Sequence, residues 1–192
     1  MQSVVPSYRQ LFEFKKQFAS DVGASALLGC LFSIKDRNLE NLFISLENGK
    51  IYHKHFFPNY NESHLLCQAD PVPFRLSRNM NEFLEPLGSF GPFAASFRSI
   101  SDAFYLNIEL VRELLRLFLR DDIIRSEALS SSTFLETSIG KNCEQITRMV
   151  EQHSPSNLGI GARICENFDE LIRSANSNDG IARLPPSWHP WF

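Results

Sequence analysis

The sequence predicts a mainly α-helical fold of the α+β class, with a single β-hairpin in its first third. Apolar residues recur every three to four positions over long stretches, most regularly from Leu106 to Leu119, which is typical of amphipathic helices. One place breaks this pattern: Asn48-Gly49 lies between two runs rich in β-branched and aromatic residues, a pairing that favours a tight turn. Hydrophobic residues make up 43% and charged residues 21% of the 192 residues, as in a globular domain.

The amino-terminal part predicts a helix followed by the hairpin. Helical spacing runs from Tyr8 to Phe18, and the apolar stretch Ala24–Ile34 can continue the same helix because Gly23 weakens a helix without forbidding it. The expected strands are Asn41–Leu46 and Lys50–Phe56.

The rest of the chain predicts loops and then helices. A polar loop precedes an extended "PVPF" segment, since proline disfavours helix in the residue before it. The segment His153–Ala162 has the composition of a linker. Helices are expected over Ser77–Leu84 with Ser77 as cap, Pro92–Phe104, Leu106–Leu119, Asp122–Leu129, Phe134–Glu151 and Ile164–Ala175.

The composition argues against nucleic-acid binding, a membrane-spanning helix and a metal or disulfide site. The formal net charge is -3 and the basic residues are scattered, so we expect no direct contact with nucleic acid. The longest apolar stretch has eleven residues, where a membrane-spanning helix needs about 20. Four cysteines lie far apart without a CxxC pair, which favours reduced thiols over a disulfide framework or a metal site. We therefore expect no metal, no cofactor and no membrane contact.

The hairpin region carries the candidate chemistry. "KDRNLENLFISLENGKIYHKHF" resembles the catalytic and metal-binding loops of the phosphatidylinositol-3-kinase-related protein kinases. In this resemblance, Asp36 falls on the catalytic aspartate and Asn41 on the asparagine that binds magnesium. Phosphoryl transfer depends on positioning and charge neutralisation, so it needs the base and both metal ligands together.

Three of the matched positions depart from the family's pattern. Asn38 falls on the catalytic-loop histidine, and His55 falls on the metal-binding aspartate of the DFG motif, whose glycine falls on Phe57. An imidazole does not replace a carboxylate for a hard cation such as magnesium. His53 and His55 alternate along the expected strand as a metal pair would, but with no third ligand we favour ordinary strand histidines. The set Asp36, Asn38, Asn41 and His55 is thus expected to be a degenerate remnant with no catalytic role.

A second string strengthens the resemblance. The stretch Asp70–Phe104, beginning "DPVPFRLSRNMNEFL", is similar to the segment that follows the activation loop in this superfamily, in the form found in its TRRAP-type pseudokinases. We expect Phe74 to be a core residue and Arg75 to pair with a buried carboxylate.

The carboxy-terminal stretch Phe168–Phe192 resembles the short helical FATC domain with which members of the superfamily end. Trp188, Trp191 and Phe192 give it large apolar side chains, and we expect them to pack on the kinase-like lobe. An aromatic tip that enters a membrane, or an exposed peptide ligand, is the alternative.

The resemblance implies three parts: a partial kinase-like carboxy-lobe over 1–152, a linker over 153–162 and a FATC domain over 163–192. It implies a non-catalytic scaffold of a nuclear transcription coactivator in histone acetyltransferase complexes of the SAGA and MYST types. Its partners would be the other subunits of those complexes, and transcription activators would bind through the remainder of a longer protein.

Two alternatives stay open. Asp36 and Asn41 are compatible with a fragment of a divergent, active Ser/Thr kinase, against which Asn38 and His55 argue. A small free-standing adaptor is the other, and it predicts a stable monomer.

Overall fold

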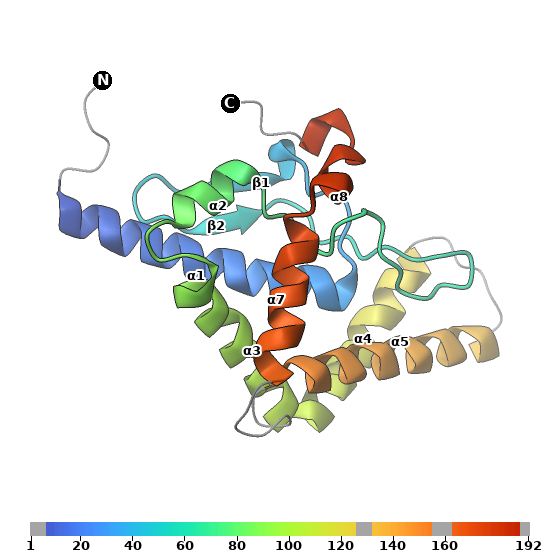
Figure 1. Cartoon of the computed structure of the whole chain (residues 1–192). Helices are drawn as coiled ribbons and strands as arrows, with labels where there is room; N and C mark the ends of the chain where they lie inside the picture. Colours follow the sequence, from blue (N-terminus) through green and yellow to red (C-terminus); the bar gives the residue numbers. More distant parts are fainter. Residues whose placement is uncertain (1–6, 126–131, 155–162, 189–192) are drawn as a thin grey trace.

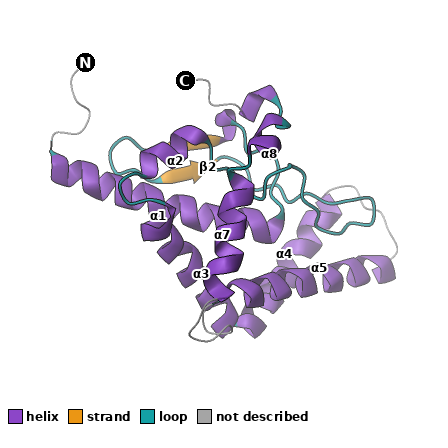
Figure 2. Cartoon of the chain, viewed as in Figure 1, coloured by secondary structure: helices purple, strands orange, loops and turns teal. Residues whose placement is uncertain are grey.

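The computed structural model describes residues 7–125, 132–154 and 163–188, and it confirms a mainly helical fold with one two-stranded sheet (Figures 1 and 2). Two short turns, η1 and η2, lie between the main elements. The elements in chain order are α1 (Tyr8–Phe32), η1 (Leu39–Asn41), β1 (Leu42–Ile44), β2 (Ile51–His53), α2 (Arg78–Leu84), η2 (Ser89–Phe93), α3 (Ala94–Leu106), α4 (Ile108–Arg125), α5 (Ser132–His153), α7 (Arg163–Ala175) and α8 (Asn178–Ala182).

Helix α1 is the central element, and it runs without a break through both predicted apolar stretches. It begins at a Ser7 cap, whose hydroxyl accepts the Gln10 amide, and it ends at Ser33 in the left-handed conformation. Gly23 is needed for packing: a Cβ there would collide with the carbonyl oxygen of Phe93. The missing side chain therefore lets the η2 turn lie directly against α1.

The β-hairpin is confirmed, with strands shorter than the predicted Asn41–Leu46 and Lys50–Phe56. Leu42 pairs with His53 and Ile44 with Ile51. The connection is longer than a two-residue turn, because the Gly49 amide donates to the Ser45 carbonyl, and Gly49 takes a φ of 77°. The Asp21 carboxylate accepts the Ile51 amide at 2.9 Å, which anchors the hairpin to α1.

Helices α4 and α5 pack against each other and, with α3, close the other side of the core. The expected helices Leu106–Leu119 and Asp122–Leu129 are parts of one helix, α4, which the structure describes as far as Arg125. Leu115, Leu119 and Ile123 are buried, whereas Leu114 is 58% exposed. This helix packs through a narrow stripe, so its surplus leucines face outward. The exposed leucines of α4 are Leu110, Leu114 and Leu117.

The carboxy-terminal helices return to the amino-terminal half of the molecule (Figure 1). Phe168 of α7 belongs to the main core, with its ring 5.2 Å from that of Phe97. After α8 the chain forms a second, small cluster of Val72, Leu184 and Trp188. Most of the predicted linker, residues 155–162, lies outside the described residues, so the three-part division remains a prediction.

Candidate functional site

The loop before the hairpin holds Asp36 and Asn41 through backbone contacts. Asp36 is exposed and takes a left-handed φ of 58°. The Asn41 side-chain amide donates to the Asp36 carbonyl at 2.9 Å, and the Asn41 carbonyl accepts the Lys54 amide at 3.0 Å. The Asn41 side chain therefore stabilises the conformation of the loop, and this structural role accounts for an asparagine at the position.

The position matched to the metal-binding aspartate is part of an aromatic stack. The ring of His55 lies parallel to that of Phe57, with centroids 4.9 Å apart and planes at 14°. Strand β2 ends at His53, so His55 lies beyond the sheet. The predicted placement of both histidines within one strand is therefore wrong. The stack places two ring systems where the resemblance expects a carboxylate and a glycine.

His53 makes a different contact. Its Nε2 lies 2.9 Å from the Ser25 hydroxyl of α1, with which it shares a hydrogen bond. The pKa of His53 is held below its ordinary value, first by loss of water around the ring and then by the positive charge of Arg37. The neutral imidazole is favoured, and it joins the hairpin to α1.

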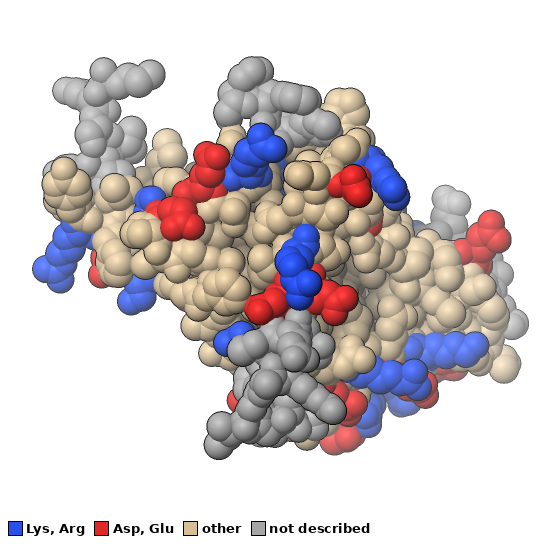
Figure 3. Space-filling view, viewed as in Figure 1, with Lys and Arg blue, Asp and Glu red and all other residues tan. Residues whose placement is uncertain are grey.

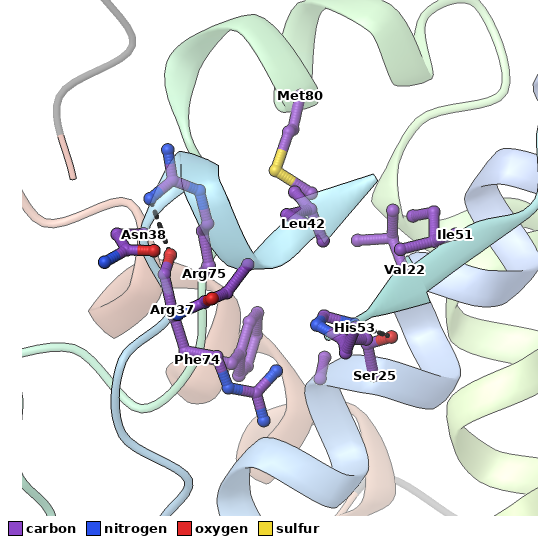
Figure 4. Close-up of a pocket in the computed structure, with 12 residues that line it drawn as sticks. Val22, Ser25, Arg37, Asn38, Leu42, Ile51, His53, Phe74, Arg75 and Met80 are labelled. Carbon is purple, nitrogen blue, oxygen red and sulfur yellow. Dashed lines mark hydrogen bonds between the residues drawn. The ribbon is translucent and has the colours of Figure 1, made fainter. Parts of the chain in front are cut away.

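Asn38 and Asn41 line one small pocket between α1, the hairpin and the segment after the predicted activation loop (Figure 4). His53, Phe74 and Arg75 also line it, whereas Asp36 and His55 do not. Its volume of about 20 Å³ is enough for one water molecule. Because ligand pockets measure about 300–1,000 Å³, this cavity by itself does not hold a nucleotide.

Arg75 is buried, and its hydrogen-bond partners among the described residues are backbone carbonyls rather than a carboxylate. In the described part of the chain, one guanidinium nitrogen donates to the Arg37 carbonyl and another to the Trp188 carbonyl, both at 2.8 Å. The guanidinium carbon also lies 5.1 Å from the centre of the Trp188 ring. Two of its nitrogens thus bond to backbone carbonyls, while its Nε is buried without a hydrogen-bond partner among the described residues. Burial lowers the pKa of Arg75 from its ordinary value.

Partly buried charged side chains, those of Arg37 and Asp70, lie at the loop before the hairpin. Burial lowers the pKa of Arg37 to about 10, while Cys30 and Asp70 act in the opposite direction. Burial and the nearby Asp36 raise the pKa of Asp70, and Arg37 partly offsets this. Asp36, Arg37 and Asp70 therefore interact electrostatically, although Asp70 lies far from the other two in the sequence.

Sequence reasoning missed Asn142, which is fully buried on α5. Its side chain accepts the Leu66 amide and donates to the His64 carbonyl, each at 2.8 Å. It thereby fixes the segment matched to the activation loop onto the helical core. The spacing was a usable signal, because Asn142 lies three residues after Ile139 and four before Ile146, on the buried face of the helix.

The predicted packing residues are placed as follows. Phe74 is buried, with its ring 6.2 Å from that of Phe93, and Trp188 is buried beneath Arg75. Trp191 and Phe192 lie outside the described residues. Over the described ranges, no three His, Cys, Asp or Glu side chains gather as metal ligands.

A larger cavity of about 410 Å³ lies between α1, the hairpin and α2, and none of the described side chains that line it titrates. On the face shown in Figure 3, acidic and basic side chains are interspersed, without a continuous basic stripe. None of the described helices is long and apolar enough to span a membrane.

Comparison with known proteins identifies the family. The sequence profile described as phosphatidylinositol 3- and 4-kinase matches residues 2–127. This chain belongs to that family. A TRRAP-type relative, the transformation/transcription domain-associated protein of Danio rerio, is 27% identical over 97% of the chain. The serine/threonine-protein kinase ATR of Drosophila melanogaster is 22% identical over 92% of it.

The fold of this family member is also found in solved structures. The open conformation of CtTel1 superposes with a TM-score of 0.65 and 17% identity, over 97% of this chain and 7% of that one. The chain spans 5% of the length of the Danio rerio relative and 7% of the length of the ATR kinase. The resemblance to TRRAP-type proteins and the mainly α fold are thus confirmed, while the activity of any longer protein is a matter for proposal.

Proposed function

We propose that this chain is a non-catalytic scaffold segment of a nuclear transcription coactivator, in histone acetyltransferase complexes of the SAGA or MYST type. Two observations support the proposal: the transcription-associated relative matches nearly the whole chain, and the hairpin departs from the kinase pattern at the metal-binding position. Its expected role is to hold the kinase-like head together and to present that head to neighbouring subunits.

The His55–Phe57 stack carries the non-catalytic part of this proposal. Magnesium takes oxygen ligands in near-octahedral geometry, and in kinases a carboxylate at this position bridges it to the phosphates. An imidazole stacked on a phenyl ring supplies no oxygen ligand. Without that ligand, the remaining Asn41 amide and Asp36 carboxylate do not neutralise the charge of a nucleotide triphosphate.

Nucleotide binding by the full-length protein tests this part. We expect millimolar ATP with magnesium to leave its melting temperature unchanged, and we expect no transfer of labelled phosphate to protein substrates. An authentic family kinase assayed in parallel shows that the conditions permit binding. A magnesium-dependent shift in the wild-type protein would refute the non-catalytic part of the proposal.

Complex membership is tested separately. An affinity-tagged full-length protein should copurify from nuclear extract with acetyltransferase activity on histones. A Trp188→Ala variant tests whether the described carboxy-terminal segment contributes to that association. Recovery of the protein alone, or only from cytosol, would contradict the scaffold proposal while leaving the nucleotide result valid.

A divergent active kinase is the second candidate, because Asp36 and Asn41 keep the residue types of the catalytic loop. Their hydrogen bond runs from the Asn41 side chain to the Asp36 backbone, so the Asp36 carboxylate itself stays free of it. Phosphoryl transfer that is lost in Asp36→Asn would support this candidate.

A further inference from the structure

The guanidinium of Arg75 joins two segments that are far apart in the sequence, whatever the function of the protein. Arg75 lies between the loop 36–41 and the carboxy-terminal turn around Trp188. The Arg37 carbonyl lies in a loop, and the Trp188 carbonyl lies at the end of the short 3-10 turn Pro186–Trp188. When carbonyls in such places are buried, they need partners other than those that helices and strands supply. One buried side chain therefore completes the hydrogen bonding of both segments.

The carboxy-terminal side of this junction is tightly fitted. Trp188 is 6% exposed and packs with Val72 and Leu184. A Cβ on Gly180 would lie 2.9 Å from a methyl carbon of Val72, so α8 approaches the "PVPF" segment as closely as glycine permits. This docking positions the Trp188 carbonyl and ring around the Arg75 guanidinium.

The loop side has few other supports. The Arg37 carbonyl accepts one Arg75 nitrogen, the Asn41 amide holds the Asp36 carbonyl, and the Lys54 amide reaches the Asn41 carbonyl. The Nε of Arg37 and the Oδ1 of Asn38 are buried without a hydrogen-bond partner. A loop with unsatisfied polar atoms depends strongly on the bonds that it does make.

We propose that Arg75 makes the docking of the carboxy-terminal turn and the ordering of the loop 36–41 one cooperative event. While Trp188 is docked, the guanidinium is held in the orientation that reaches the Arg37 carbonyl. When the carboxy-terminal turn undocks, Arg75 loses its contact with the Trp188 ring and its hydrogen bond to the Trp188 carbonyl. Its guanidinium can then move into solvent. A partner that draws the carboxy-terminal turn away from the lobe thus loosens the loop at the kinase-like site.

Hydrogen exchange on the full 192-residue chain tests the coupling. We expect Trp188→Ala to speed exchange of the Asn41 and Lys54 amides about tenfold or more, since a hydrogen bond to a charged group is of that order. Arg75→Met should give the same acceleration, and adding Trp188→Ala to it should give no further increase. Arg112→Met removes an arginine from an exposed pair with Glu109 and serves as the matched control.

Two outcomes overturn the proposal. In one, Trp188→Ala speeds exchange in α8 while the Asn41 and Lys54 amides keep their wild-type rates. In the other, the effects of Trp188→Ala and Arg75→Met on these amides multiply as independent changes. Amides of α3 report global unfolding, and the milder variants Trp188→Phe and Arg75→Lys replace the first pair if those amides also accelerate. Arg75→Lys keeps the charge but not the two-armed geometry, so it should still loosen the loop.

Discussion

Arg75 donates a hydrogen bond of 2.8 Å to the carbonyl of Trp188, a residue 113 positions further along the chain, and lies over its indole ring. The same guanidinium bonds the Arg37 carbonyl. The loop before the hairpin and the carboxy-terminal end of the described chain therefore meet at one buried cation.

Replacing Arg75 with methionine should lower the free energy of unfolding by about 3 kcal/mol, because two buried carbonyls lose a charged donor. Arg75→Lys should lose less, since an ammonium still satisfies one of them. Urea denaturation followed by circular dichroism measures both. Equal stability of the methionine variant and the wild type would show that water replaces the guanidinium without loss.

Two glycines in helices should respond in opposite directions to alanine. Gly23→Ala should destabilise the protein by about 2–3 kcal/mol, because the new methyl group meets the Phe93 carbonyl in a packed core. Gly140→Ala is the matched control: nothing lies within 4 Å of its Cβ position on α5. There, alanine should stabilise the helix by about 0.5–1 kcal/mol. Thermal unfolding of both variants checks this, and a shared sign would contradict the packing at α1.

Asn142→Leu should cost about 2–4 kcal/mol, because the Leu66 amide and the His64 carbonyl lose their partner in a buried place. Gln145→Ala is the comparison on the same helix. Its single bond to the Leu66 carbonyl is longer, at 3.3 Å, so its loss should cost about 1 kcal/mol or less. Chemical denaturation gives both values. If limited proteolysis within 57–70 stays as slow in Asn142→Leu as in the wild type, Asn142 does not hold that segment.

Stability should fall in mild acid through His153. Burial lowers its pKa, and its ring packs edge-on against Phe97. Above the unfolded pKa of about 6.5, both states are neutral and the group adds no pH dependence. As the pH falls below that value, the unfolded state binds a proton that the folded state resists, so the free energy of unfolding decreases. His153→Gln should lose less stability than the wild type between about pH 7.5 and 5.5 in urea titrations. Equal losses would exclude this linkage.

The sequence was a good guide where local chemistry decides the outcome. The Ser77 cap, the helix that follows it and the Asn48-Gly49 hairpin all form because their signals lie within a few residues. Helix α1 crosses Gly23 because tertiary packing against Phe93 outweighs the weak local preference.

The site was less predictable because its contacts are long-range. The partners of Arg75 lie 38 and 113 residues away. Both are backbone carbonyls, which every residue has, so the sequence does not indicate which of them will bind the arginine. The spacing of apolar residues in α4 predicts a helix, but it does not show which of these residues are buried against another element. The structure buries only a narrow stripe of them. The resemblance located the positions matched to the kinase motifs, but only the geometry showed that His55 and Phe57 contact each other.

That contact bears on how the hairpin can change over evolutionary time. His55→Asp alone returns a carboxylate but leaves Phe57 without its stacking partner, and Phe57→Gly alone removes the ring that the imidazole covers. Either single step forfeits a pair worth about 0.5 kcal/mol or more before any metal ligation is gained. A change of both positions to the kinase pattern therefore passes through a single variant whose folded state is less stable. The His55–Phe57 stack thus disfavours each first substitution.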